Sequence, residues 1–486
     1  MAGFMIAAPR SGSGKTMVTC GILELLKRKQ KNPFSYKCGP DYIDGLFHQK
    51  VLGIDGGNLD SFFEDPEEMK KKLNIISKEY FPVIEGVMGY FDGLGGDTTA
   101  ASSWEVADIL DLPVVLVVDA KGASLSLAAL IKGFQVFGNG RSGNHIRAVI
   151  LNRISPMLYP RMKKVIEKET GILVVGYVPE LDFWQVGSRH LGLVLPDEIK
   201  DLQSQMGQLG DCLEKTLDVD ELLRLGESAD FLKPAVEKIN DSDQNHEIQK
   251  DGKTGLNGQP AGEKNSCTQH QVLLGVAWDE AFCFYYRDNL EFLEKLGAEI
   301  LRFSPVHDKH LPEDLDGLLL GGGYPELYGK ALEENKTMRN EIRRKTEEDM
   351  PVLAECGGYL YLLKELEDEN GTGYEMAGVF SGKGFKKGKN SHFGYITVET
   401  ESDSLYLKAG ERIKGHEFHY WESTQDENEL KMQAQKPTGK RGWPCVTIKN
   451  QVMAGFSHLY YPSMEGFGKR FIQACDTYRK KRERQH

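Results

Sequence analysis

One segment near the N-terminus constrains the fold of this chain more than any other. An apolar run at Phe4–Ala7 leads into the Gly- and Ser-rich segment Ala8–Thr16 (APRSGSGKT), and helical periodicity follows over Lys15–Lys29. A strand, a glycine-rich turn and a helix in this order form a P-loop. The usual pattern has glycine where Pro9 stands, and its other defining positions are present. The segment therefore predicts a nucleotide-binding domain that is built on a parallel sheet.

Each residue of this loop has an expected role. Gly12, Ser13 and Gly14 should turn consecutive backbone N–H groups toward phosphate oxygens, beside the positive end of the following helix. Lys15 should reach the β- and γ-phosphates, and Thr16 should hold Mg²⁺. The alternative is a Gly- and Ser-rich turn with a chance lysine, and the agreement of strand, loop and helix disfavours it.

Short β-branched runs recur along the chain with helical segments between them, and this alternation is typical of parallel α/β folds. In the first half we expect strands at Phe4–Ala7, Phe34–Cys38, Pro82–Val87, Pro113–Asp119, Ile146–Asn152 and Ile172–Val178. In the second half we expect them at Val272–Ala277, Ile300–Phe303, Gly317–Leu320, Pro351–Ala354, Val446–Ile448 and Met453–Phe456. The predicted class is α/β, with a P-loop domain followed by a second α/β domain.

The stretch 237–270 separates the two halves. It contains no aromatic residue and few apolar ones, so it cannot bury enough surface to offset the entropy of becoming ordered. We predict a flexible linker there, between a nucleotide-binding domain over 1–236 and a second domain over 271–486.

Composition excludes several classes of function. The net charge of −12 lacks the positive field that non-specific nucleic-acid binding uses. No apolar run approaches the roughly 18 residues of a membrane span, and no signal segment precedes the first strand, so we expect a cytoplasmic protein without a membrane partner. The eight cysteines include no C-x-x-C pair, which disfavours a structural zinc site or a disulfide framework.

Two acidic segments follow predicted strands of the first half. Asp41 and Asp44 lie in GPDYID, and Glu85 and Asp92 lie in IEGVMGYFD. The carboxyl edge of a parallel sheet lies beside the bound nucleotide, and carboxylates there suit Mg²⁺. These four residues are candidates for binding metal or orienting substrate. The alternative for each is a loop or helix-capping carboxylate.

Cys356 is the candidate nucleophile of the second half. It follows an apolar strand and precedes two glycines and a helix (PVLAECGGYLYLL), which resembles a nucleophile elbow. His458, just past another predicted strand, is the candidate base. In GHEFHY, His416 and His419 are open to roles as ligands, bases or surface residues. The strand end LLLGGGYPE, with Gly322 and Gly323, is a candidate source of oxyanion donors.

In this order the segments resemble the cobyrinic acid a,c-diamide synthase family, over nearly the whole chain outside the linker. These enzymes combine an ATPase domain like dethiobiotin synthetase with a class I glutaminase domain. The resemblance is carried by PRSGSGKT, GPDYID, IEGVMGYFDG, VVDAKGASLSLAAL, SRHLGL, GVAWDEAFCFYYRDNLEFLEKLGAE, LLLGGGYPEL, AECGGYLYLL, GHEFHY and GFSHLYYPS.

The resemblance implies a ligase of cobalamin biosynthesis with ATP and Mg²⁺ as cofactors. Glutamine would form a thioester at Cys356, with His458 as base and Gly322 and Gly323 as oxyanion donors. The ammonia released would amidate the a and c acetates of cobyrinic acid, after ATP has phosphorylated each carboxylate. The resemblance assigns further residues to substrate, metal or the activated carboxylate: Asp41, Tyr42, Ile43, Asp44, Glu85 and Asp92.

A polycarboxylate substrate requires a basic pocket in a protein of net charge −12. The candidates are Arg189 and a lysine cluster of the second half, for which a solvated loop is the alternative: Lys383, Lys386, Lys387 and Lys389. The chain also departs from class I glutaminases at Tyr460, because these enzymes generally have a carboxylate two residues after the histidine. The sequence therefore leaves open what orients His458.

Other functions stay open at this point. The acceptor could instead be nickel sirohydrochlorin or hydrogenobyrinic acid, because enzymes acting on these tetrapyrroles share the motifs. A different class of function is a non-catalytic P-loop switch that keeps a glutaminase-like binding module. The expected partners are small molecules in a monomer or homodimer: a tetrapyrrole polycarboxylate, glutamine and ATP.

Overall fold

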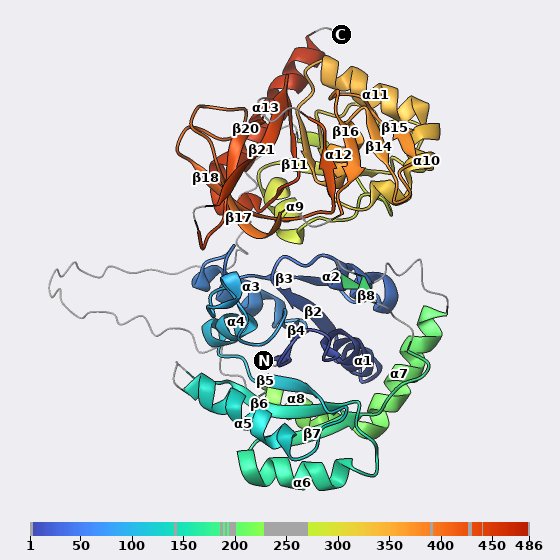
Figure 1. The fold of residues 1–486 in the computed structure, drawn as a ribbon. Coiled ribbons are helices and arrows are strands. Elements are labelled where there is room, and N and C mark those ends of the chain that lie inside the picture. The colour runs from blue at the N-terminus through green and yellow to red at the C-terminus, as the bar shows by residue number, and fades with distance from the viewer. Residues whose placement is uncertain are drawn as a thin grey trace, which may run out of the picture.

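A computed structural model of the chain describes residues 3–139, 143–184, 188–189, 192–193, 201–227, 271–388, 392–425, 430–439 and 441–484. The chain forms two bodies that lie one above the other (Figure 1). The first half makes one body and the segment from residue 271 onward makes the other. The linker predicted at 237–270 lies outside the described residues.

The N-terminal body is built on a seven-stranded sheet in the order β3-β2-β4-β1-β5-β6-β7, and all its strand pairs are parallel. The strands are β1 (Phe4–Ala7), β2 (Pro33–Cys38), β3 (Gly56–Leu59), β4 (Phe81–Glu85), β5 (Val114–Asp119), β6 (Ile146–Asn152) and β7 (Leu173–Val178). Helices cover both faces of this sheet, so its central strands are buried apolar runs. The helices are α1 (Lys15–Arg28), α2 (Ile43–Phe47), α3 (Pro66–Ile76), α4 (Ser103–Leu110), α5 (Ser126–Asn139), α6 (Tyr159–Thr170), α7 (Leu202–Thr216) and α8 (Val219–Glu227).

This sheet confirms the predicted parallel α/β domain. Strands β1 and β6 have the expected bounds, and the other predicted strands agree with the structure within a few residues. The sequence missed β3, because its Gly56 and Gly57 give it no β-branched run. Strand β4 ends at Glu85 rather than at Val87, so Glu85 lies at the end of its strand.

The C-terminal body contains a ten-stranded sheet in the order β11-β10-β12-β13-β22-β21-β20-β17-β18-β23. Its strands are β10 (Val272–Ala277), β11 (Ala298–Phe303), β12 (Gly317–Leu320), β13 (Val352–Glu355), β17 (Phe393–Glu399), β18 (Arg412–Phe418), β20 (Leu430–Gln435), β21 (Gly442–Lys449), β22 (Val452–Gly455) and β23 (His458–Leu459). In this spatial order, the five strands β11, β10, β12, β13 and β22 are parallel to one another. Every further pair, beginning with β22 and β21, is antiparallel. Because β12, β13 and β22 are neighbours, the segments that follow them meet at one edge.

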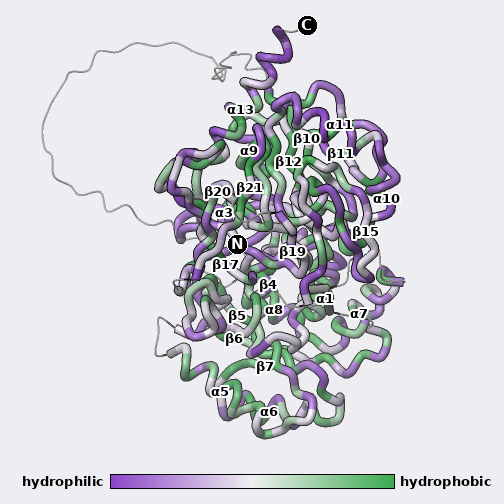
Figure 2. The backbone as a smooth tube through the Cα atoms, turned by 45° about the horizontal axis from the view of Figure 1, so that its top comes forward, coloured by the Kyte–Doolittle hydropathy of each residue, from purple (hydrophilic) through white to green (hydrophobic). Residues whose placement is uncertain are grey.

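Helices and a smaller sheet complete this body. The helices are α9 (Arg287–Lys295), α10 (Gly329–Glu334), α11 (Lys336–Glu347), α12 (Gly357–Leu362) and α13 (Glu465–Glu483), and the small sheet contains β14 (Glu365–Glu367), β15 (Gly373–Glu375), β16 (Lys383–Lys386) and β19 (Trp421–Ser423). Figure 2 shows hydrophobic residues concentrated on the central strands, whereas α11 and the end of α13 are hydrophilic. Within the described ranges, no helix combines the length and apolar character that crossing a membrane requires.

The two bodies meet through a buried aromatic cluster and several polar contacts. In the cluster, Phe63 of the N-terminal body stacks on Tyr460 of the other, with centroids 4.9 Å apart. Beside it, the hydroxyl of Tyr395 donates to Asp60 Oδ2 at 2.8 Å, and Lys72 Nζ lies 2.6 Å from Asp288 Oδ2. Burial raises the pKa of Asp60 to about 6. These contacts hold the carboxyl edges of the two sheets toward each other.

Candidate active site

The glycine-rich loop after β1 has the conformation that a phosphate cradle needs. Gly12 and Gly14 have φ of +75° and +93°, which L-residues with a side chain rarely adopt. A Cβ on Gly14 would lie 2.2 Å from the Nδ2 atom of Asn152, and this Nδ2 donates to the Ser13 carbonyl at 2.9 Å. Asn152, at the end of β6, therefore braces the loop. The sequence analysis did not identify this residue.

Thr16 and Glu85 come together as expected, at the ends of the loop and of β4. The hydroxyl of Thr16 donates to Glu85 Oε1 at 2.6 Å, and Lys37 Nζ donates to the same oxygen at 2.9 Å. Lys15 Nζ donates to the Met88 carbonyl. Glu85 is fully buried, and His48 Nε2 lies 3.9 Å from its other oxygen. A hydroxyl and a carboxylate side by side form a donor set that suits Mg²⁺.

Lys37 and His48 are functional candidates that the sequence analysis missed. Lys37 lies in register with Glu85 across β2 and β4. A lysine within the otherwise apolar run Phe34–Cys38 was the available signal, because a buried lysine requires an anionic partner.

The other predicted residues of this half fall into two groups. Asp41 and Asp92 line a cavity between the two bodies. Asp41 Oδ2 lies 3.7 Å from Lys37 Nζ, and Asp92 Oδ2 accepts from the Gly89 N–H at 3.0 Å. The backbones of Ile43 and Asp44 lie in the first turn of α2, and Arg189 lies in the short strand β8 (Ser188–Arg189); the side chains of these three residues lie outside the described part of the structure.

Cys356 lies on the expected sharp turn between β13 and α12. Its φ of +47° and ψ of −101° are unusual for a residue with a side chain, and its N–H donates to the Gly455 carbonyl at 2.8 Å. A Cβ on Gly358 would lie 2.1 Å from the Leu320 carbonyl oxygen, so the turn requires this glycine. Burial raises the pKa of the Cys356 thiol. The thiolate therefore requires a base nearby.

His458 lies in β23, in register with His416 of β18. The two imidazole rings stack with centroids 4.8 Å apart. A Cβ on Gly322 would lie 2.4 Å from His458 Cε1, so the ring lies directly against the glycine turn. Burial, with the field of His419, lowers the pKa of His458 to about 3. His458 is therefore a neutral imidazole, the form that accepts a proton.

The turn after β12 adjoins the elbow as the sequence predicted. A Cβ on Gly357 would lie only 2.9 Å from the backbone N of Gly323. On Gly323 itself a Cβ would lie 2.0 Å from the Ala281 carbonyl oxygen, so only glycine fits there. Backbone N–H groups are thus close to the candidate nucleophile, which is where an oxyanion hole requires donors.

The buried carboxylate of Glu417 lies in β18, beside His416, which is paired with His458 across the two strands. Glu417 accepts from the Ser457 hydroxyl at 2.5 Å and from the Trp443 indole at 3.0 Å, and His419 Nε2 lies 3.6 Å from its Oε2. Burial opposes protonation of His419, but Glu417 raises the pKa of His419 overall. His416 and His419 are therefore buried side chains of the site rather than surface residues.

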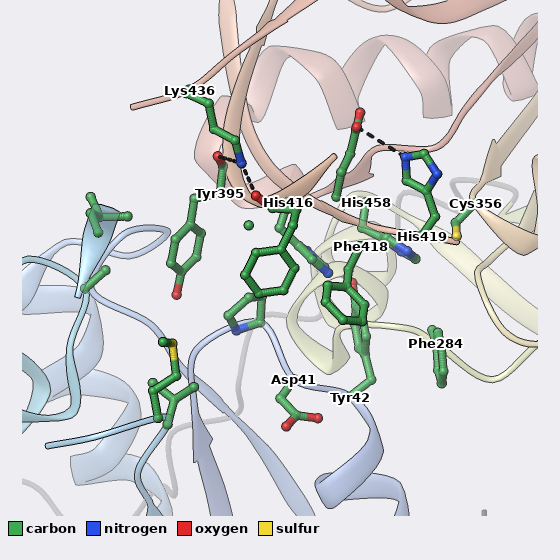
Figure 3. A pocket seen from close by; sticks show the side chains of 18 of the residues that line it. Asp41, Tyr42, Phe284, Cys356, Tyr395, His416, Phe418, His419, Lys436 and His458 are labelled. Atoms are coloured by element: carbon green, nitrogen blue, oxygen red, sulfur yellow. Dashed lines mark hydrogen bonds and ion pairs between the residues drawn. The ribbon is translucent and has the colours of Figure 1, made fainter. Parts of the chain in front are cut away.

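One cavity of about 750 Å³ lies between the two bodies and is lined by candidate residues of both. The N-terminal body contributes Asp41, Tyr42 and Asp92, and the C-terminal body contributes Cys356 and His458. Figure 3 shows Asp41 and Tyr42 on one side of this space and Cys356 and His458 on the other. Most of the remaining lining comes from the C-terminal body, with aromatic side chains prominent: Phe284, Phe393, Tyr395, Phe418, Tyr420 and Trp421. Its size and its apolar lining are typical of a small-molecule site.

The basic residues of this cavity differ from those proposed from the sequence. Lys436 and Arg441 line it. Lys383 instead pairs with Glu365 at 2.7 Å and with Glu367 at 2.8 Å. Lys386 lies 3.2 Å from Glu369, and Lys387 lies 3.9 Å from Glu422. Lys389 lies outside the described residues. The three described lysines of the cluster are thus paired with glutamates rather than lining the cavity.

Tyr42 connects the two centres. It belongs to the GPDYID segment of the nucleotide-binding body, yet its ring stacks on Phe284 of the other body, with centroids 5.5 Å and planes 6° apart. The Tyr42 ring centroid also lies 5.5 Å from that of His458. Figure 3 shows Tyr42 between Asp41 and the histidines. A residue of the N-terminal body is therefore in contact with His458, the candidate base of the C-terminal body.

Comparison with known proteins agrees with this architecture. Residues 4–193 match the CobQ/CobB/MinD/ParA nucleotide binding domain, and residues 274–465 match the CobB/CobQ-like glutamine amidotransferase domain. A cobyrinate a,c-diamide synthase of Caldanaerobacter subterraneus subsp. tengcongensis is 37% identical over 98% of this chain and 99% of its own. One of Listeria innocua serovar 6a is 36% identical over 96% of this chain and 99% of its own. With such identity over nearly the full length of both chains, this protein belongs to the cobyrinate a,c-diamide synthase family.

Proposed function

We propose that this protein amidates the a and c acetate carboxylates of cobyrinate, with ATP and glutamine, in cobalamin biosynthesis. The observation that carries the proposal is the single cavity lined both by Asp41 and Asp92 and by Cys356 and His458. A non-catalytic switch would have no use for an intact elbow and base that open into the same space as the acidic residues. The names of the curated relatives support the choice of acceptor.

In the glutaminase half, the Cys356 thiol passes its proton to His458, and the thiolate attacks the side-chain amide carbon of glutamine. N–H groups of the turn at Gly322 and Gly323 stabilise the oxyanion. Ammonia leaves with the proton from His458, and a thioester remains on Cys356. Water then hydrolyses the thioester to glutamate.

In the synthetase half, the loop at 12–16 holds the phosphates of ATP, and Lys15 stabilises the charge that develops as the γ-phosphoryl group is transferred. A substrate carboxylate oxygen attacks this group, and ammonia then displaces phosphate to form the amide. Asp41 and Asp92 lie where they would orient the acceptor. Thr16 and Glu85 would hold Mg²⁺, with Asp44 as a further candidate, and the ion would neutralise phosphate charge.

The shared cavity confines ammonia between the two halves. In bulk water ammonia is largely protonated and cannot act as a nucleophile, so confinement preserves the reactive form. Lys436 and Arg441 line the same space and supply positive charge for a polycarboxylate acceptor. The net charge of −12 is thereby compatible with an anionic substrate.

Tyr42→Ala should uncouple the two halves. The ring of Tyr42 separates Asp41 from His458 and packs on both bodies, so its removal opens the cavity and shifts the reacting groups relative to each other. We expect the amide formed per glutamine hydrolysed to fall roughly ten- to hundredfold, since a displacement of about 1 Å can have an effect of that size. Parallel assays of glutamate and product measure the ratio. Tyr42→Phe keeps the ring and should keep the coupling; equal ratios in the alanine variant and the wild type would contradict this role.

The proposed acceptor is tested by mass spectrometry of the products from candidate macrocycles. Purified protein is incubated with ATP, Mg²⁺, glutamine and, separately, cobyrinate, hydrogenobyrinate or nickel sirohydrochlorin. With cobyrinate we expect a product in which two carboxyl groups have become primary amides, so that NH2 replaces OH at each of them. Amidation of nickel sirohydrochlorin without amidation of cobyrinate would contradict the proposal.

A further inference from the structure

His458 lacks the carboxylate that class I glutaminases generally supply two residues after the histidine. Tyr460 stands at that position, and its hydroxyl donates to Asp288 Oδ2 at 3.0 Å. This oxygen also lies 2.6 Å from Lys72 Nζ of the other body. Asp288 therefore belongs to the contact between the bodies. The Nδ1 atom of His458 is buried and has no hydrogen-bond partner within the described part of the chain.

A different carboxylate faces this nitrogen. Glu355 immediately precedes the nucleophile at the end of β13, and its Oε2 lies 3.9 Å from His458 Nδ1. Its other oxygen, Oε1, accepts from the Tyr461 hydroxyl at 2.9 Å and from the Leu459 N–H at 3.2 Å. These two donors lie on either side of position 460 in the segment that carries His458. One oxygen is thus held by this segment while the other is directed to the imidazole.

Glu417 is the other buried carboxylate near His458, but its oxygens are already engaged. Oε1 accepts from the Ser457 hydroxyl, and Oε2 accepts from the Trp443 indole. His419 and His392 lie 3.6 and 3.8 Å from Oε2. Glu417 therefore acts on His458 through its field, whereas Glu355 lies within a short movement of a direct hydrogen bond.

We propose that Glu355 positions His458 and stabilises its protonated form, in place of the carboxylate that is missing at position 460. This inference rests on the proposed glutaminase half-reaction. Because Nδ1 faces Glu355, Nε2 is the nitrogen that takes the proton from the Cys356 thiol. Nδ1–H then donates to the carboxylate, and the imidazolium gains a buried counter-charge, as in hydrolases that use a triad.

The electrostatic setting gives this arrangement a measurable signature. Burial raises the pKa of Glu355 to about 8, so the carboxylate that can pair with an imidazolium becomes populated as the pH rises through that range. The groups that face the pair are Tyr42, Tyr285, Tyr461, His416 and Cys356, and the fields of Glu417 and His419 reach it. Besides burial, the direct field of the Glu355 carboxylate raises the pKa of the Cys356 thiol. A glutamate without a positioning role would therefore, when removed, leave the ionisation of Cys356 unchanged or shift it to lower pH, whereas loss of the counter-charge to the imidazolium shifts it to higher pH.

The test compares Glu355→Gln and Glu355→Asp with the wild-type enzyme. For Glu355→Gln we expect the glutaminase kcat to fall roughly 10²- to 10⁴-fold, with little change in KM. The midpoint of iodoacetamide alkylation at Cys356, followed by mass spectrometry of its peptide, should move up by about one pH unit. Glu355→Asp should retain part of both properties. Asp288→Asn, which changes the carboxylate that position 460 contacts, is the matched control and should leave the midpoint unchanged.

An unchanged or lowered midpoint in Glu355→Gln would overturn the assignment, as would a larger upward shift in Glu417→Gln. Ammonia-driven amidation reports whether each variant is folded. If Glu355→Gln does not fold, Tyr461→Phe is the variant to test, because it removes one hydrogen-bond donor to Glu355 and leaves the carboxylate in place. A small upward shift of the alkylation midpoint in Tyr461→Phe supports the proposal, and an unchanged midpoint overturns it. Wild-type protein that hydrolyses glutamine but amidates no macrocycle would contradict the proposed function and leave the role of Glu355 standing.

Discussion

Cys356→Ala should abolish amidation from glutamine while amidation from ammonium salts continues. Loss of a catalytic nucleophile typically reduces the rate by roughly 10⁴- to 10⁶-fold, and no described cysteine other than Cys356 lines the cavity. The synthetase half has its own residues on the other body, and free ammonia can enter the shared cavity without passing through the thioester. The variant therefore separates the two half-reactions.

Amide formation with glutamine and with ammonium chloride, measured side by side, tests this expectation. Cys475 is also buried in the C-terminal body and lies in its core, so Cys475→Ala is a suitable control that should keep glutamine use. Undiminished glutamine-dependent turnover in Cys356→Ala would contradict the assignment of the nucleophile. Loss of turnover with both nitrogen sources would contradict the separation of the two centres.

Lys15→Ala should have the complementary effect. The side chain lies in the glycine-rich loop at the start of α1, 8% exposed, and its Nζ donates to the Met88 carbonyl. At this position of a P-loop the lysine reaches the β- and γ-phosphates. Its removal leaves the charge of the transferred phosphoryl group unbalanced, so amidation should fall by roughly 10³-fold with either glutamine or ammonia. Glutamine hydrolysis should persist, because Cys356 and His458 belong to the other body.

ATP-dependent amide formation and glutamate release, measured in the same samples, test this expectation. Lys29 immediately follows the same helix, is exposed and pairs with Asp220 at 3.2 Å, so Lys29→Ala controls for loss of a positive charge near α1. Amidation at the wild-type rate in Lys15→Ala would show that the loop does not serve ATP.

The residues that the sequence identified share one property: their role depends on a short local pattern. Three segments show this: the loop at 12–16, the elbow at Cys356 and the turn at Gly322 and Gly323. In each of them a strand ends in a tight turn whose backbone requires glycine. A parallel sheet then gathers such strand ends at one edge, so Thr16 could be expected beside Glu85 and the elbow beside the glycine turn.

The sequence did not predict the residues whose partners lie far away along the chain. Lys37 and His48 both contact Glu85, and Asn152 contacts a loop more than a hundred residues away. The sequence also did not indicate the basic lining at Lys436 and Arg441. The lysine cluster that it did indicate does not line the cavity, because each of its described members is paired with a glutamate.

The sequence by itself determined the α/β fold class, and it predicted the phosphate loop, the candidate nucleophile Cys356 and the candidate base His458, since each depends on spacing along one strand, turn and helix. Only the tertiary structure decided how the two domains share one cavity, why Tyr42 contacts His458, and which carboxylate faces His458 in place of one at position 460. These features depend on the packing of two bodies and on the register of β13, β22 and β23. Side-chain distances across such contacts are set by three-dimensional packing. No local pattern in a single sequence indicates these distances.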